Sequence, residues 1–102
     1  MPVAYTATAV ESAPLTLREL ARAVGAEDQW VLRLVEVEIL HVDAPEEPPA
    51  RWQFRSADLQ RALAARRLER DFGANLDAAA LILDLQTELR RLRAVIGAHG
   101  IG

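Results

Sequence analysis

The chain has 102 residues, of which 51% are apolar, enough for one domain with a modest core. It contains no cysteine, which excludes disulfides, iron–sulfur clusters and thiol chemistry. All 12 basic residues are arginine, and the net charge is −3. Because phosphate backbones repel such a chain unless one face is locally basic, the balance favours a protein partner over nucleic acid.

The two ends of the sequence carry weak signals. No apolar run approaches the roughly 18 residues of a membrane helix, and MPVAYTATAV lacks the basic and apolar regions of a secretory signal. We therefore expect a cytoplasmic protein. Residues 1–14 are expected to be a tail or a short edge strand, with Val3, Tyr5, Ala7 and Ala9 alternating along it. Residues 98–102 are expected to be a C-terminal tail.

A first helix is predicted to begin after Thr16. Thr16 and Glu19 have the spacing of a capping box, in which each side chain accepts a hydrogen bond from the other's backbone N–H. The apolar residues that follow recur at helical spacing; they are Leu17, Leu20, Ala21 and Val24. Gly25 is expected to end the helix, because a residue without Cβ most easily adopts the left-handed conformation found there.

A second helix is predicted almost at once, with Ala26 as a poor N-cap and Glu27 and Asp28 near the positive helix end. Its buried stripe is expected at Val31, Leu34 and Val35, with Trp30 at the edge. Two short helices separated by a glycine predict a helix-turn-helix.

A small β-hairpin, or wing, is predicted after these helices. Residues 39–42 are expected to pair with residues 51–54 across a proline-rich loop at 43–50. Trp52 and Phe54 are two residues apart and would share one face of the strand. Such a pair could stack bases, but the burial of aromatic side chains dominates the energetics of a small domain. We therefore expect the pair to hold the wing to the core.

Two further helices are predicted. The third runs from its N-cap at Ser56 to about Phe72, where Gly73 ends it. Its apolar stripe drifts round the helix, at Leu59, Ala62, Ala65, Leu68 and Phe72. The fourth is capped by Asn75 and spans about Leu76 to Ile96, roughly 30 Å at 1.5 Å per residue.

The fourth helix carries a leucine seam. Leu85, Leu89, Leu92 and Ile96 are spaced 4, 3 and 4, as in a heptad, and Leu81 continues the seam one turn earlier. The seam could be intramolecular core or a contact between two copies in a homodimer. Two to three heptads are too short to decide between these alternatives.

Catalytic, metal and cofactor sites find no support in the sequence. His41 and His99 lack a nearby nucleophile or acid in a catalytic arrangement. No glycine-rich phosphate loop and no cluster with metal-ligand spacing is present. We therefore expect a protein that is not an enzyme and that needs no metal or cofactor.

Several arginines could contact phosphate. Arg51 and Arg55 flank the aromatic pair, and Arg33 lies on the second helix. A further basic group on the third helix, Arg66, Arg67 and Arg70, is interleaved with Glu69 and Asp71. Alternating signs of this kind are typical of a solvated helix face.

Three segments, LTLRELARAVGAEDQWVLRLVEVEIL, RWQF and RRLERDFGANLDAAALILDLQTELRRLR, together resemble the MerR-like fold, and more closely the CbpM family of chaperone modulators. The resemblance covers about residues 15 to 96. It is carried by the Trp52–Phe54 segment, by Arg67–Leu68 to Asp71–Phe72, and by NLDAAALILDL. It implies a mainly α domain over residues 15–97: a winged helix-turn-helix followed by two helices, the last one long.

The resemblance also implies a function. Proteins of the CbpM family bind the J-domain of the DnaJ-like co-chaperone CbpA, block its stimulation of the DnaK-type chaperone and curb its DNA binding. In DNA-binding MerR relatives, the second helix and the following turn carry basic residues that contact phosphate. As the resemblance implies, Leu32 and Glu36 stand at the positions in this sequence where those relatives have basic residues. From Glu27 to Glu38 the chain has four acids against Arg33, which would repel phosphate.

A J-domain presents a basic helix beside its His-Pro-Asp loop, as the resemblance implies, and an acidic surface complements it. Two acidic patches are candidates. The first comprises Glu27, Asp28, Glu36 and Glu38; the second comprises Glu69, Asp71, Asp77, Asp84 and Glu88. The alternative function is a MerR-type DNA-binding transcriptional regulator that contacts phosphate through Arg33, Arg51 and Arg55.

Overall fold

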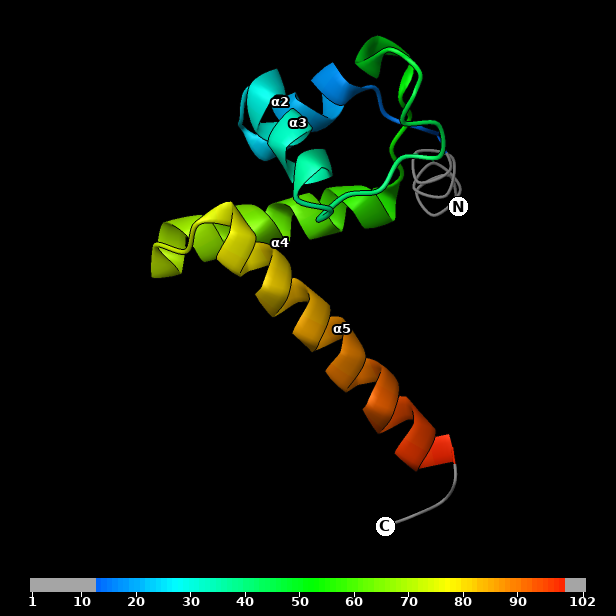
Figure 1. Ribbon diagram of the computed structural model, residues 1–102, viewed down its shortest axis with the longest axis vertical. Helices are drawn as coiled ribbons and strands as arrows, with labels where there is room; N and C mark the ends of the chain where they lie inside the picture. Colours follow the sequence, from blue (N-terminus) through cyan, green and yellow to red (C-terminus); the bar gives the residue numbers. More distant parts are fainter. Residues whose placement is uncertain (1–12, 99–102) are drawn as a thin grey trace, which may run out of the picture.

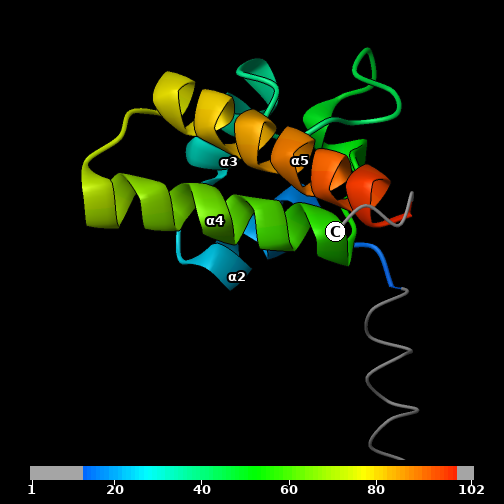
Figure 2. The same cartoon turned by 90° about the horizontal axis from the view of Figure 1, so that it is seen from below.

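The computed structural model describes residues 13–98, and this part of the chain contains four α-helices and one 3-10 helix. They are α2 (Leu17–Val24), α3 (Asp28–Glu36), η1 (Pro49–Arg51), α4 (Ser56–Phe72) and α5 (Leu76–Ala98). The pair α2 and α3 lies on one side of α4, and α5 leaves the C-terminal end of α4 (Figure 1). After the turn, α5 runs back across α4 and packs against it, and its second half diverges from α4 (Figure 1 and Figure 2). The predicted mainly helical fold is confirmed.

Three predictions fall outside the described residues, wholly or in part. They are the edge strand at Val3, Tyr5, Ala7 and Ala9, the position of His99, and the C-terminal tail at residues 98–102, of which only Ala98 is described. Ala98 belongs to the last helix, so the predicted start of the tail at that residue is wrong.

The first helix has the predicted caps. The Thr16 N–H donates to Glu19 Oε1 at 2.9 Å, and the Glu19 N–H donates to Thr16 Oγ1 at 3.1 Å. Gly25 has a φ of 71°, which lets the Ala26 N–H turn back to the Ala21 carbonyl at 2.9 Å. The predicted core face of α2 is buried. Local sequence signals therefore determine both ends of this helix.

The N-cap of α3 is Glu27, and the predicted cap at Ala26 is wrong. The Ala26 N–H is already used to close α2 at Ala21, so the next helix begins one residue later. Val31 and Leu34 are fully buried, as predicted, whereas Val35 is only half-buried. The helix-turn-helix itself is confirmed by two short helices that pack on each other.

The predicted wing is absent: residues 39–42 do not pair with residues 51–54, and residues 13–98 contain no strand. Ile39 and Leu40 are consecutive and both buried, which a strand with alternating faces cannot achieve. Their N–H groups donate to the Leu34 carbonyl, at 2.8 and 3.1 Å, and so cap α3. Both donors are therefore unavailable to a hairpin ladder.

Phe54 joins the core through a different partner. It forms an isolated antiparallel bridge with Leu15, in which the Leu15 N–H donates to the Phe54 carbonyl at 2.7 Å and the Phe54 N–H donates back at 2.8 Å. The Phe54 side chain is fully buried, and Trp52 is half-buried against the same core. The aromatic pair is thus a core element, as predicted, although no wing carries it.

The N-cap of α4 is Arg55, one residue before the predicted Ser56. The Arg55 N–H donates to Asp58 Oδ2 at 2.8 Å. A guanidinium has no acceptor, so the reciprocal bond of a capping box cannot form. Ala62 and Ala65 are buried as predicted, but Phe72 is 76% exposed, because the stripe has rotated away from the core by the last turn.

The last helix begins as predicted, because the Ala78 N–H donates to Asn75 Oδ1 at 2.8 Å. It ends at Ala98, two residues beyond the predicted Ile96. Leu76, Ala79 and Leu83 are buried, whereas residues 84–97 are exposed. None of the helices in residues 13–98 combines the length and apolar character required to cross a membrane.

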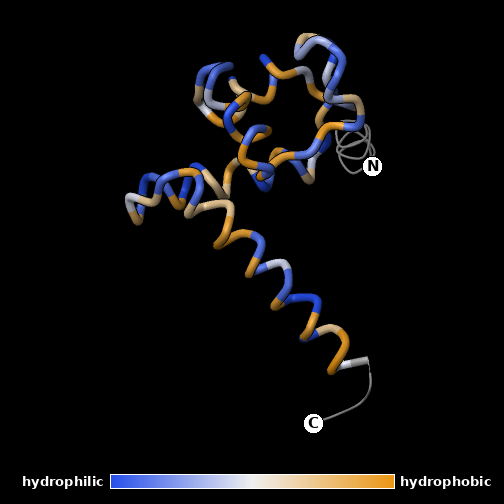
Figure 3. Tube along the Cα trace, viewed as in Figure 1, coloured by the Kyte–Doolittle hydropathy of each residue, from blue (hydrophilic) through white to orange (hydrophobic). Residues whose placement is uncertain are grey.

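The leucine seam of α5 is exposed. Leu85, Leu89, Leu92 and Ile96 are 60%, 47%, 52% and 50% exposed, and Leu81 is 61% exposed. Figure 3 shows apolar segments recurring along the whole of α5, including the half that extends beyond the other helices. Of the two alternatives for the seam, intramolecular core is therefore wrong.

The two phenylalanines provide a matched test of the core. We expect Phe54→Ala to lower the free energy of unfolding by about 3–5 kcal/mol, since it removes a fully buried ring. Phe72→Ala, at a ring that is 76% exposed, should change it by less than about 0.5 kcal/mol. Urea unfolding followed by circular dichroism measures both. Equal losses would contradict this core.

Candidate functional site

The exit of α3 has an unusual backbone conformation. Glu38 has a φ of 65° and is the only non-glycine residue in residues 13–98 with a positive φ. Its N–H donates to the Val35 carbonyl at 3.1 Å, and the Ile39 N–H donates to the Leu34 carbonyl at 2.8 Å. These two bonds form a Schellman motif, whose left-handed position is usually glycine. A glutamate there costs about 1 kcal/mol of backbone strain.

The strained residue presents a carboxylate to solvent. Glu36 and Glu38 are both exposed, and we call this pair the acidic exit. Neither forms an ion pair with any residue that the structure describes. Val37 lies between them and is half-buried. The left-handed turn at Glu38 closes α3 through the backbone bonds of the Schellman motif, and the two carboxylates beside it have no ion-pair partner among the described residues.

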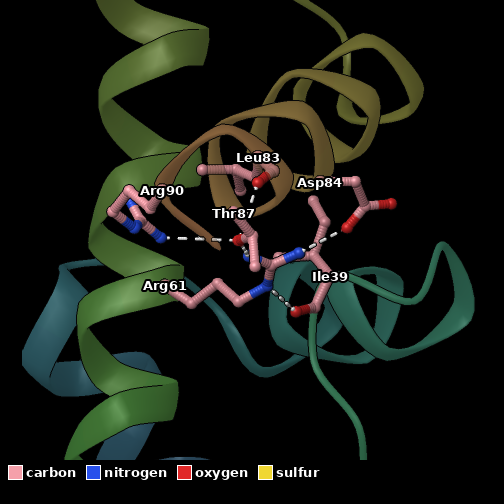
Figure 4. A network of polar contacts seen from close by, with 6 residues as sticks. All are labelled: Ile39, Arg61, Leu83, Asp84, Thr87 and Arg90. Atoms are coloured by element: carbon pink, nitrogen blue, oxygen red, sulfur yellow. Dashed lines mark hydrogen bonds and ion pairs between the residues drawn. The ribbon is translucent and has the colours of Figure 1, made fainter. Parts of the chain in front are cut away.

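Arg61 of α4 fixes the position of the acidic exit. Its Nε donates to the Ile39 carbonyl at 2.6 Å, and its Nη2 donates to Asp84 Oδ1 on α5 at 2.8 Å (Figure 4). Thr87 adds a longer contact to Nη1 at 3.5 Å. The Arg61 side chain is only 24% exposed. One guanidinium therefore joins α4, the segment after α3 and α5.

This network joins Asp84, through Arg61, to the backbone of the residue that follows the acidic exit. Ile39 follows Glu38 directly, and its carbonyl binds the same guanidinium as the Asp84 carboxylate. Asp84 remains 67% exposed, although its charge is balanced by Arg61. Of the second predicted patch, Asp84 thus binds the same guanidinium as the carbonyl of the residue that follows Glu38.

The other predicted acids do not gather into one surface. Glu27 and Asp28 lie at the start of α3, about 12 Å from Glu36 by helical rise. Asp28 is 3.6 Å from Arg18 in an ion pair. Asp71 and Asp77 are exposed beside the α4–α5 turn, and Glu88 pairs with Arg91 at 2.8 Å.

Glu69 has a structural contact. Its Oε1 accepts a hydrogen bond from Trp30 Nε1 at 2.8 Å, and the Cζ of Arg66 lies 5.6 Å from the centroid of the Trp30 ring. These contacts hold α3 against α4. Glu69 is half-buried, so it contributes little to a charged docking surface.

The arginines of the DNA-binding alternative are exposed but scattered. Arg33 lies on α3, Arg51 is 3.5 Å from Glu47 in an ion pair, and Arg55 caps α4. Without a hairpin, no paired strands carry Arg51 and Arg55 towards a duplex. Leu32 is half-buried and contributes to packing against the core.

Residues 13–98 contain no group of three His, Asp or Glu side chains placed to hold a metal ion. His41 is exposed and lines a shallow pocket with Asp43, Gln53, Arg55 and Asp58. No serine or threonine lines that pocket, so His41 has no hydroxyl nucleophile beside it.

Arg61 was not identified from the sequence. Its partners are 22 and 23 residues away, and no local spacing reveals such a contact. The strain at Glu38 was also missed, because a glutamate in a run of acids gives no sign of a left-handed backbone. Only the position of Glu38 after a predicted helix could have raised the question.

The described residues form a helix-turn-helix followed by two further helices, the second of which turns back on the first. The family of MerR HTH regulatory proteins matches residues 15–97, and the chain therefore belongs to this family. No curated protein and no solved structure matches the sequence.

Arg61→Ala tests the network that positions the acidic exit. It should lower the free energy of unfolding by about 2 kcal/mol, since it leaves the Ile39 carbonyl and Asp84 without their half-buried partner. Arg91→Ala, at a pair exposed on both sides, should change it by less than about 0.5 kcal/mol. Thermal unfolding measures both. Indistinguishable variants would show that Arg61 does not hold these segments together.

Proposed function

We propose that this MerR-type domain is a protein-binding modulator that docks the J-domain of a CbpA-type co-chaperone through the acidic exit. The observation that carries the proposal is the strained, exposed Glu38 beside Glu36, at the end of the helix that a DNA-binding relative would use to contact phosphate. Glu36 and Glu38 are unpaired among the described residues, so their charge is available to a partner.

Charge argues for a protein partner. Arg33 is the only cation on α3, and the chain as a whole carries −3. Each acid near a phosphate removes part of the counterion-release gain that drives duplex binding. A basic helix beside a His-Pro-Asp loop, which the resemblance to the CbpM family assigns to the J-domain, has the complementary sign. Complementary charge accelerates association and selects the partner.

Affinity requires apolar contacts as well. Val37 lies between Glu36 and Glu38 and is partly exposed, so it is placed to anchor a docked helix. The J-domain would then be covered where it contacts its DnaK-type chaperone. Under this proposal the protein acts by occupancy, without catalysing a reaction and without a metal or cofactor.

We also propose that two copies pair through α5. Residues 84–97 are exposed over about four turns, and an isolated helix of that length is marginal in water. The exposed seam of Leu85, Leu89, Leu92 and Ile96 would be covered by the same seam of a second copy. In such a dimer, the seam of each α5 helix packs against a seam of the same length.

Charge reversal at the acidic exit tests the partner. We expect Glu36→Lys with Glu38→Lys to lower the rate of association with a CbpA-type J-domain about tenfold at low salt, because two attractive charges become repulsive. Surface plasmon resonance with the immobilised J-domain measures the rate. Asp71→Lys with Asp77→Lys makes the same change of net charge at the other candidate patch and should leave the rate nearly unchanged.

Two outcomes count against this proposal. A wild-type chain that forms no complex at tens of micromolar removes the partner. A rate lowered only by the Asp71 and Asp77 substitutions moves the site to the α4–α5 turn.

A DNA-binding regulator is the second candidate, favoured by the family match and by the exposure of Arg33 and Arg55. It requires retardation of duplex fragments in low salt, with affinity that falls steeply as salt is added. On the proposed function the wild-type chain retards no fragment.

The pairing of two copies is tested by light scattering after gel filtration. At about 100 µM the wild-type chain should have a mass near twice 11.2 kDa, because a dimer buries the exposed seam. Leu89→Glu should give the mass of the monomer, since it places a charge in the seam. Ala94→Glu, on the opposite face of α5, should remain dimeric. A wild-type monomer, or a dimeric Leu89→Glu variant, would contradict pairing through this seam.

A further inference from the structure

A pocket of about 260 Å³ lies between the end of α2 and the second half of α4, and three arginines surround it. It is lined by Val24, Leu63, Arg66, Arg67, Arg70 and Asp71. Arg66 and Arg70 are four residues apart and share one face of α4, and Arg67, one position further round the helix than Arg66, also lines the pocket. The acidic exit contributes no residue to this pocket.

Arg66 is held in place before any ligand binds. Its Nη2 donates to the Gly25 carbonyl at 3.0 Å, and its guanidinium lies 5.6 Å from the centroid of the Trp30 ring. Its Nε is buried and has no acceptor among residues 13–98. These contacts fix the position of the guanidinium, which lowers the entropic cost of binding an anion.

None of the three arginines of this cluster forms an ion pair within residues 13–98, although Asp71 lines the same pocket. Arg18, Arg51, Arg61 and Arg91 each have a carboxylate oxygen within 4.0 Å, whereas Arg66, Arg67 and Arg70 have none in residues 13–98. Three like charges on adjacent helical turns repel one another. An anion between them would relieve that repulsion.

We propose that this pocket binds a compact dianion, the phosphate group of a small phosphate monoester. Arginine forks bind phosphate oxygens bidentately, and three positive charges match a dianion better than a single carboxylate. Val24 and Leu63 offer an apolar wall to the carbon part of the ligand. Asp71 at the rim opposes further negative charge, which disfavours a polyanion such as duplex DNA.

The test uses the full chain and inorganic phosphate as the probe, with acetate and chloride at the same ionic strength as comparisons. Phosphate should bind at about millimolar concentration and shift the amide resonances around Val24 and Arg67. Arg67→Gln with Arg70→Gln should weaken binding about tenfold. Both residues are exposed, so the variant is expected to fold. Arg90→Gln with Arg93→Gln makes the same charge change on α5 and should bind phosphate as the wild type does.

Each alternative result has a definite meaning. Equal binding by the two double variants, or equal binding of acetate and phosphate, would overturn the site. So would resonance shifts that chloride reproduces. If a short DNA duplex displaced phosphate from the wild type but not from the Arg67 and Arg70 variant, the pocket would belong to a polymer and the compact ligand would be excluded. A sugar phosphate that bound more tightly than inorganic phosphate would support the monoester.

Discussion

The Arg61 guanidinium, enclosed between α4, α5 and the segment after α3, is the contact on which the arrangement of the surface depends. It satisfies the Ile39 carbonyl and the Asp84 carboxylate at once, at 2.6 and 2.8 Å. A planar fork suits two acceptors in different directions better than a flexible ammonium group does. Because Ile39 follows Glu38, the same contact determines where the acidic exit lies relative to α5.

Two surface features of the molecule carry charges of opposite sign. The acidic exit carries unpaired carboxylates on a strained turn, while the pocket at the end of α2 carries unpaired guanidinium groups over Val24 and Leu63. Neither arrangement improves the stability of the fold, since both place like charges close together. On the proposed function, a helix-turn-helix with these surfaces serves partners other than a phosphate backbone.

The sequence predicted what depends on neighbouring residues. The sequence correctly predicted the helix caps at Thr16 with Glu19, at Gly25 and at Asn75. It could do so because a cap depends on hydrogen bonds between residues a few positions apart. The wing was wrong because Ile39 and Leu40 cap α3, and Phe54 pairs with Leu15, far along the chain. Nor could the sequence separate Glu36 and Glu38 from acids such as Asp28, which has an ion-pair partner. Tertiary contacts decide which charges remain available.

The central claim is that the end of α3 contacts a basic protein helix. Amide chemical-shift mapping of the wild-type chain, titrated in parallel with a CbpA-type J-domain and with a DNA duplex, tests it most directly. The claim predicts that the J-domain shifts the resonances of residues 36–40 and of Asp84, and that the duplex leaves them unchanged. Shifts along α3 with the duplex, and none with the J-domain, would contradict it.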